Sequence, residues 1–196
     1  METKAKIMQT AERTFGQKGF SGASIREISK LCDVNIASIN YHFESKEKLF
    51  LEVVKSNRKY LEQEIKDICC SNLEVEQCVL QIFRLFVKNG DKVLLTFKFL
   101  MTNLDGQDLR IIKTAEGQFG PPGIDFFLDY LISQFPDTDL QALQFMSRNV
   151  FSVICQSSLA LSCPGLGKHL KKSNNYNLQS QENNLVELSK FFVNAF

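Results

Sequence analysis

Apolar residues recur at helical spacing along the chain, and no segment alternates between apolar and polar residues as a half-buried strand would. In the first such segment, Ile7, Ala11 and Phe15 share one face, and Gly19 follows as a left-handed stop. The pattern therefore predicts an all-α fold. Besides two short helices between residues 24 and 43, the expected helices span residues 4–18, 46–69, 74–88, 92–102, 109–116, 124–132, 137–161 and 182–195, with a polar loop at residues 162–181.

The two short helices are separated by a tight turn. Ser24 and Glu27 have the spacing of a capping box, which starts the first helix. Asp33 tolerates a left-handed backbone in the turn, and Asn35 can cap the second helix, residues 36–43, through its side-chain oxygen. Two helices held at a steep angle by such a turn form a DNA-reading unit. The expected buried face of the first helix consists of Ile25, Ile28 and Leu31.

The second helix carries short polar and aromatic hydrogen-bonding groups on the faces that it does not bury. Such groups suit base edges and phosphates in a major groove. Asn40 is expected to contact a base edge, and Tyr41 and Lys46 to contact phosphates, Lys46 because it begins the next helix. The candidate DNA-contacting residues are Ser24, Asn35, Ala37, Ser38, Asn40, Tyr41, His42 and Lys46.

A larger set of residues carries a family resemblance: Ile7, Ala11, Phe15, Gly19, Phe20, Ser24, Ile25, Ile28, Val34, Ala37, Ser38, Ile39, Tyr41, His42, Phe43, Ser45, Lys46, Glu47 and Leu49. With these residues at these spacings, the first fifty or so residues closely resemble the TetR-type amino-terminal domain. Three positions depart from the family pattern: Asp33 and Ser29 stand where Gly and Ala are usual, and Asn40 where an aromatic residue is common. The resemblance implies a three-helix helix-turn-helix head followed by an all-helical body that binds a ligand and dimerises.

The resemblance also sets the expected domains and the dimer interface. The DNA-binding domain is expected at residues 1–50, with a linking helix at about 46–69, and the effector-binding and dimerisation domain at residues 51–196. In proteins that the chain resembles, the last two long helices pair with those of a second copy. A two-fold dimer also doubles the base contacts. The residues expected at the interface are Leu143, Val150, Ile154, Leu185, Leu188 and Phe192.

Aromatic residues are concentrated in the expected body. A Phe at helical spacing is usually a core residue, but the resemblance favours a pocket for the set as a whole. Polar groups such as Tyr130, Asn103 and Gln156 would orient a hydrophobic or aromatic effector there. The candidate effector-binding residues are Phe83, Phe86, Phe97, Met101, Phe126, Phe127, Tyr130 and Phe151.

Composition agrees with a protein that has a large core: the 196 residues are 44% hydrophobic and include 17 Phe. The formal net charge of +1 divides unevenly, since residues 1–60 hold 11 Lys+Arg against 7 Asp+Glu and residues 61–196 hold 12 against 15. The basic part is therefore the part with the helix-turn-helix pattern. We expect a cytoplasmic protein without a membrane partner, because the amino terminus does not resemble a signal peptide and no apolar run could span a bilayer.

The sequence offers little enzymatic chemistry. The six cysteines have no metal-ligand spacing, so no metal and no cofactor are expected. Residues 163–169 superficially resemble a phosphate loop, but Ser162 replaces its first Gly and His169 replaces the Ser or Thr after Lys168. We therefore expect a homodimeric repressor that leaves a near-palindromic double-stranded operator when a small hydrophobic or aromatic effector binds. Two alternatives remain: an interaction protein acting through protein partners, and a regulator switched by oxidation of Cys69 and Cys70.

Overall fold

The computed structural model describes residues 2–102, 120–163, 165, 170 and 176–195, and these residues form helices and no strand. The all-α prediction is confirmed. The helices of the described residues are α1 (Glu2–Gly22), α2 (Ile25–Cys32), α3 (Ile36–Phe43), α4 (Lys46–Cys69), α5 (Val75–Lys88), α6 (Gly90–Thr102), α7 (Ile124–Gln134), α8 (Leu140–Ser162) and α10 (Leu178–Val193). None of these helices is long and apolar enough to cross a membrane.

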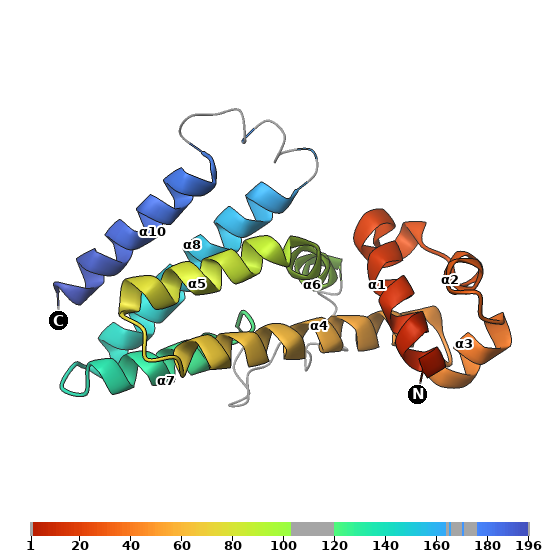
Figure 1. The fold of residues 1–196 in the computed structure, drawn as a ribbon, viewed down its shortest axis with the longest axis horizontal. Coiled ribbons are helices and arrows are strands. Elements are labelled where there is room, and N and C mark those ends of the chain that lie inside the picture. Colours follow the sequence, from red (N-terminus) through yellow and green to blue (C-terminus); the bar gives the residue numbers. More distant parts are fainter. Residues whose placement is uncertain (1, 103–119, 164, 166–169, 171–175, 196) are drawn as a thin grey trace.

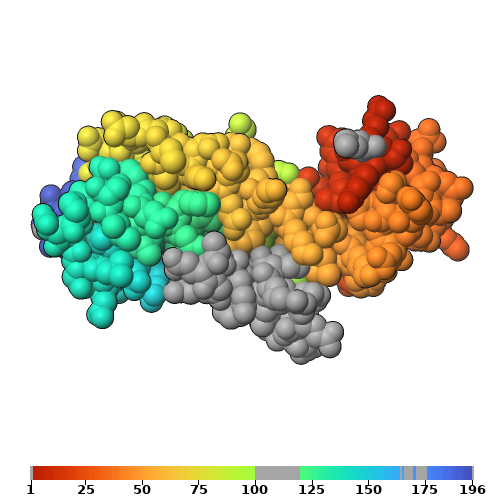
Figure 2. All heavy atoms as spheres, turned by 90° about the horizontal axis from the view of Figure 1, so that it is seen from below, coloured from red at the N-terminus to blue at the C-terminus, as the bar shows by residue number. Residues whose placement is uncertain are grey.

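Helices α1, α2 and α3 pack around the start of α4 and form a head at one end of an elongated molecule (Figure 1 and Figure 2). Phe15 lies at the centre of this head, fully buried, with its ring 4.9 Å from that of Phe50 on α4. Gly19 interrupts the helical backbone of α1 at a φ of 71°, as expected from the sequence. The chain nevertheless returns to helical structure beyond the kink and reaches Gly22.

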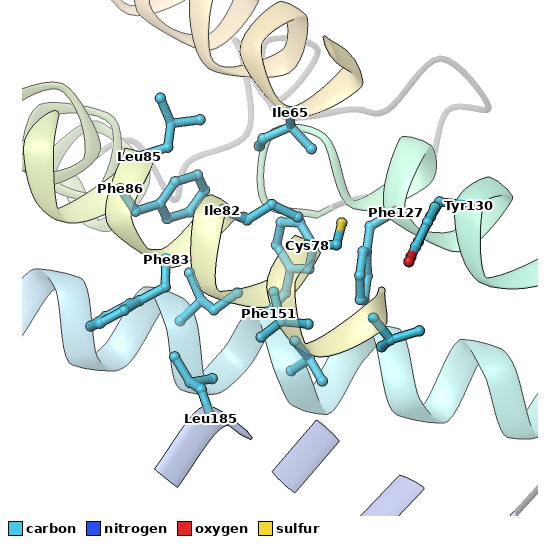
Figure 3. Close-up of a cluster of buried hydrophobic side chains, with 14 of the residues drawn as sticks. Ile65, Cys78, Ile82, Phe83, Leu85, Phe86, Phe127, Tyr130, Phe151 and Leu185 are labelled. Carbon is cyan, nitrogen blue, oxygen red and sulfur yellow. The ribbon is translucent and has the colours of Figure 1, made fainter. Parts of the chain in front are cut away.

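Helix α4 runs from the head into the body, where α5, α7, α8 and α10 surround the second hydrophobic core (Figure 1). Phe83 and Phe86 of α5 point into this core together with Phe127 of α7 and Phe151 of α8 (Figure 3). At the start of α7, Gly123 adopts a φ of 80°, and a Cβ there would lie only 2.6 Å from Ile65 of α4. Glycine is therefore needed both for the backbone conformation and for the close approach of α7 to α4.

Helix α6 packs against the head as well as the body. Its residues Leu95 and Phe99 are 1% and 2% exposed and belong to the hydrophobic core of the head. The ring of Phe99 lies 5.9 Å from that of Phe50. On the same helix, Lys92 contacts the carboxylate of Glu12 on α1. The head is thus held by two helices of the body side, α4 and α6.

Helix bounds differ from the expected ones mainly near the carboxyl terminus. Helix α10 begins at Leu178, within the segment expected to be a polar loop, because Asn177 and Ser180 form a reciprocal capping box. The sequence pattern does not reveal this start, since the usual box carries Glu or Gln at the position that Ser180 occupies. The helix expected at residues 109–116 lies outside the described residues.

Candidate nucleic-acid interface

The turn between α2 and α3 has the geometry that the sequence predicts. Asp33 adopts the left-handed conformation, with φ and ψ both 50°. The Ser29 hydroxyl donates a hydrogen bond to the Val34 carbonyl across the turn at 2.6 Å. Asn35 caps α3, and its side-chain oxygen accepts a hydrogen bond from the Ala37 amide at 2.9 Å. The two helices are therefore fixed by local hydrogen bonds at both ends of the turn.

The start and the face of α2 depart from expectation in two respects. Only half of the expected capping box is present: the Ser24 hydroxyl accepts from the Glu27 amide at 3.1 Å, but the Glu27 carboxylate contacts Lys18 of α1. Leu31, expected on the buried face, is 63% exposed, whereas Ile28 and Cys32 are buried. Residues four positions apart on a helix, such as Ile28 and Cys32, lie closer to one face than residues three positions apart, such as Ile28 and Leu31.

Helix α3 presents polar and aromatic groups to the outside of the head. Ile39 and Phe43 are buried and attach the helix to the head, while Asn40 and Ala37 are exposed and Tyr41 is 85% exposed. Among the other candidates, Ser38 and His42 are half-buried, and the side-chain oxygens of Ser24 and Asn35 are engaged in capping. The outermost groups available to a ligand on this helix are thus Ala37, Asn40 and Tyr41.

The amino terminus of α4 lies directly after α3. Ser45 caps it, accepting from the Lys48 amide at 3.2 Å, and Lys46 holds its ammonium 4.4 Å from the centre of the Phe20 ring. The Glu47 carboxylate accepts hydrogen bonds from its own backbone amide and from the Ser45 hydroxyl, and this lowers its pKa below the ordinary value. A cation and free amide groups at a helix amino terminus suit an oxyanion, although Glu47 competes for the same amides.

The residues expected to bind an effector are mostly core residues. Phe83, Phe86, Phe127 and Phe151 are completely buried among other side chains. Tyr130 is 6% exposed and donates a hydrogen bond to the Leu73 carbonyl at 2.7 Å, Phe126 stacks under Lys66, and the side chain of Met101 lies outside the described residues. Of the seven candidates whose side chains the structure describes, only Phe97 lines a cavity of about 770 Å³ in the body.

This cavity, which we call the groove, is a cleft of about 770 Å³ between α6, α7 and α8. Helix α8 forms its floor, and α6 and the start of α7 form its walls. Burial in the floor of the groove raises the pKa of the Cys155 thiol to about 12. The residues lining the groove are Leu94, Phe97, Gly120, Pro121, Ile124, Asp125, Leu128, Gln144, Ser147, Arg148, Ser152, Cys155, Gln156, Leu159, Ala160 and Cys163.

The residues expected at a dimer interface also lie inside a single chain. Val150, Ile154 and Leu185 are completely buried, Leu143 and Phe192 nearly so, and Leu188 is half-buried against the same core. The outward-facing aromatic residues on these two helices are instead Phe145, 61% exposed, and Phe191, 68% exposed. Both rings pack beside that of Phe192, at 5.9 and 5.7 Å. A dimer contact on α8 and α10 stays a prediction, and these exposed rings are its available surface.

The fold and this site define a helix-turn-helix DNA-binding protein with a helical body. Residues 7–53 match the family model described as bacterial regulatory proteins, tetR family. "Probable HTH-type transcriptional regulator YttP" of Bacillus subtilis is 34% identical over 119 residues, which cover 59% of this chain and 58% of YttP. The HTH-type transcriptional repressor NicS of Pseudomonas putida is 42% identical over 53 residues, 27% of this chain and 25% of NicS.

Similarity at the level of the fold extends over nearly the whole chain. A crystal structure described as that of a TetR-family transcriptional regulator from Mesorhizobium loti covers 99% of this chain and 96% of its own, with a TM-score of 0.72 and 17% identity. The matches to YttP and NicS, in contrast, span less than two thirds of those proteins. Residues 7–53 of the chain therefore form a TetR-type amino-terminal domain. The relatives named here are described as a transcriptional regulator and a transcriptional repressor, and neither is described as an enzyme.

Proposed function

We propose that the protein is a homodimeric transcriptional repressor that binds a double-stranded operator through α3 and is released by a small apolar molecule bound in the body. The observation that supports this most strongly is the position of Asn40 and Tyr41, exposed on the second helix of a helix-turn-helix whose turn is fixed by local hydrogen bonds. The amino-terminal similarity to NicS, which is named as a repressor, supports repression rather than activation of transcription. Such a protein would act in the cytoplasm, where bacterial DNA lies.

In this proposal, α3 enters the major groove and the start of α4 rests on the backbone. Asn40 can make two hydrogen bonds to a base edge, since its amide carries both a donor and an acceptor. Lys46 and the hydroxyl of Tyr41 are placed for neighbouring phosphates. A two-fold dimer would place two copies of α3 about one helical turn apart, which requires a near-palindromic operator. The exposed Phe145 and Phe191 supply an apolar patch for pairing the two copies.

Release requires that occupancy of the groove changes the position of the head, and two connections favour this. On α6, Leu94 and Phe97 line the groove while Leu95 and Phe99 pack in the core of the head. On α4, buried Arg58 donates a hydrogen bond at 3.0 Å to the carbonyl of Gly120, which is itself a groove residue. A ligand that binds the groove more tightly after these helices have shifted would stabilise the shifted state. In that state, the distance between the two heads of the dimer would no longer match the operator, and the protein would leave the DNA.

A repression assay tests this function. The protein is expressed in a strain carrying a reporter behind a promoter that contains the candidate operator, with Tyr41→Ala as the matched variant. We expect repression by the wild-type protein and at least a tenfold weaker repression with Tyr41→Ala at equal protein level. Equal reporter output with both proteins would contradict DNA recognition by α3. If the protein then also binds a protein partner, the alternative of an interaction protein whose head does not bind DNA would be supported.

A further inference from the structure

The dimensions of the groove restrict the shape of its ligand. Its floor extends along α8 from Gln144 to Cys163, the residue that caps the end of the helix. Because an α-helix rises 1.5 Å per residue, this stretch is about 28 Å long. A volume of about 770 Å³ spread over that length leaves a cross-section of only about 27 Å². The groove therefore suits an extended chain better than a compact fused-ring molecule.

The two ends of the groove differ in polarity. The end near the start of α8 carries Gln144, Arg148 and, from α7, Asp125. The end near the carboxyl terminus of α8 carries Gln156, Leu159 and Ala160, facing Leu94 and Phe97 of α6, and none of these side chains is charged. An occupant with one polar end and one long apolar end would match both.

A buried hydroxyl lies near the polar end. Ser147 lines the groove, is 1% exposed, and its Oγ has no hydrogen-bond partner. A buried polar group without a partner destabilises the protein, and a ligand oxygen that supplies the missing hydrogen bond removes this cost. Ser147 therefore indicates a ligand whose polar group accepts a hydrogen bond from this hydroxyl.

The charges at the polar end favour an anionic group. Asp125 lies in the first turn of α7, where the helix dipole and free amides compensate a carboxylate. Arg148 lies in the middle of α8, is exposed, and makes no ion pair with any residue that the structure describes. The carboxylate of Asp125 is thus partly compensated by its own helix, whereas the guanidinium of Arg148 is not. Since a guanidinium binds a carboxylate in a charge-assisted, bidentate manner, a carboxylate is the best fit.

We propose that the groove binds a long-chain fatty acid, with its carboxylate at Arg148 and Ser147 and its alkyl chain lying along α8 toward Phe97 and Leu159. This deepens the proposed function, because the groove is the site assigned there to the effector. The carboxylate makes the charged hydrogen bonds, and the chain excludes water from the apolar end. Contact between the alkyl chain and Phe97 shifts α6.

Calorimetric titration of the full chain, without DNA, tests the ligand class. Hexanoate, decanoate and palmitate are titrated below their critical micelle concentrations, and decanol and decylamine are compared with decanoate. Affinity is expected to rise about fourfold for each added methylene group until the groove is filled. Decanoate should bind at least tenfold more tightly than decylamine. Affinities independent of chain length, or equal for acid and amine, would overturn the proposal.

Paired variants test the position of each end. Arg148→Gln should weaken decanoate binding about tenfold, whereas Asp125→Asn, which removes the nearby negative charge, should strengthen it. Ala160→Trp fills the apolar end and should reverse the preference for palmitate over decanoate, while Gln141→Trp, exposed on α8 outside the groove, should not. A thermal melt of each variant confirms folding. Unchanged chain-length preference in folded Ala160→Trp would place the chain elsewhere and contradict the proposal.

The outcome is separable from that of the proposed function. If the protein binds an operator and another compound releases it, while fatty acids do not bind, the function stands and the ligand class is wrong. If fatty acids bind with the expected profile but the head binds no DNA specifically, the ligand class stands and the repressor function is wrong.

Discussion

Leu95 and Phe97 lie two residues apart on α6 and face different parts of the molecule. Leu95 is 1% exposed in the core of the head, and Phe97 is 44% exposed in the wall of the groove. Side chains two positions apart on a helix point roughly to opposite sides. One helix therefore carries a groove contact and a head contact on a rigid backbone, and no loop intervenes between them.

Truncation at these two positions should have different consequences. Leu95→Ala removes buried methyl groups and should lower the free energy of unfolding by about 2–5 kcal/mol, with faster amide hydrogen exchange in α1. Phe97→Ala removes a partly exposed ring and should cost less than about 1 kcal/mol. Denaturant unfolding with hydrogen exchange measures both. A larger destabilisation by Phe97→Ala would mean that α6 is anchored mainly through the groove.

The buried phenylalanines of the body should behave as core residues. Phe127→Ala and Phe151→Ala leave cavities in a fully packed region and should each cost about 3–5 kcal/mol in unfolding experiments, as should Phe15→Ala in the head. If either body variant keeps wild-type stability while losing response to a small molecule, a ligand cavity opens beside that ring in solution.

Two asparagines of the helix-turn-helix should be distinguishable. Asn35→Ala removes the cap of α3 and should cost about 1 kcal/mol of stability. Asn40→Ala should leave stability unchanged but relax the operator preference at one base pair per half-site by about 1–3 kcal/mol. Fluorescence anisotropy with operator and scrambled DNA measures the preference. Equal weakening on both DNAs would remove Asn40 from the base-contacting residues.

The start of α4 should show opposing effects of its two charged residues. Lys46→Ala should reduce the slope of log affinity against log salt by about one unit for each phosphate that Lys46 neutralises, on any DNA sequence. Glu47→Gln removes a negative charge beside the same phosphate and should strengthen binding to any DNA. An unchanged salt slope in Lys46→Ala would show that Lys46 makes no phosphate contact.

Glu47 should also contribute to acid sensitivity. Its pKa is lowered in the folded protein, so the stabilisation that it provides is fully present above its unfolded pKa near 4.5 and disappears as pH falls through the folded value. The melting temperatures of the wild type and Glu47→Gln should therefore differ at pH 6, and this difference should shrink as the pH falls below 4.5. A constant difference across this range would assign the effect to something other than ionisation.

Pairing of two copies should depend on the exposed rings rather than on the buried stripe. Phe145→Glu with Phe191→Glu should give a folded monomer by analytical ultracentrifugation, because each substitution places a charge in the expected contact. Gln141→Glu with Asn183→Glu, exposed on the same two helices, is the matched control and should remain dimeric. A dimer in both cases would place the interface on another face.

The sequence predicts the head better than the body, for a physical reason. Asp33 and Asn35 act through local backbone geometry, which depends on neighbours in the chain, so their roles can be derived from residue type and spacing. Phe127 and Phe151 lie in the core rather than in the expected pocket, because helical spacing shows that a face is apolar but not whether side chains or a cavity cover it. The polar row Gln144, Arg148, Ser152 and Gln156 on α8, spaced by four, is the signal in the sequence that could have revealed the groove.

Specific DNA recognition by α3 is tested most directly by selecting fragments of the organism's own genomic DNA on the purified protein and sequencing what is retained. We predict enrichment of a small set of fragments that share a near-palindromic site with half-sites about one helical turn apart, and disappearance of that enrichment with Asn40→Ala combined with Tyr41→Ala. Retention of fragments without a common site, or the same enrichment with the double variant, would contradict it.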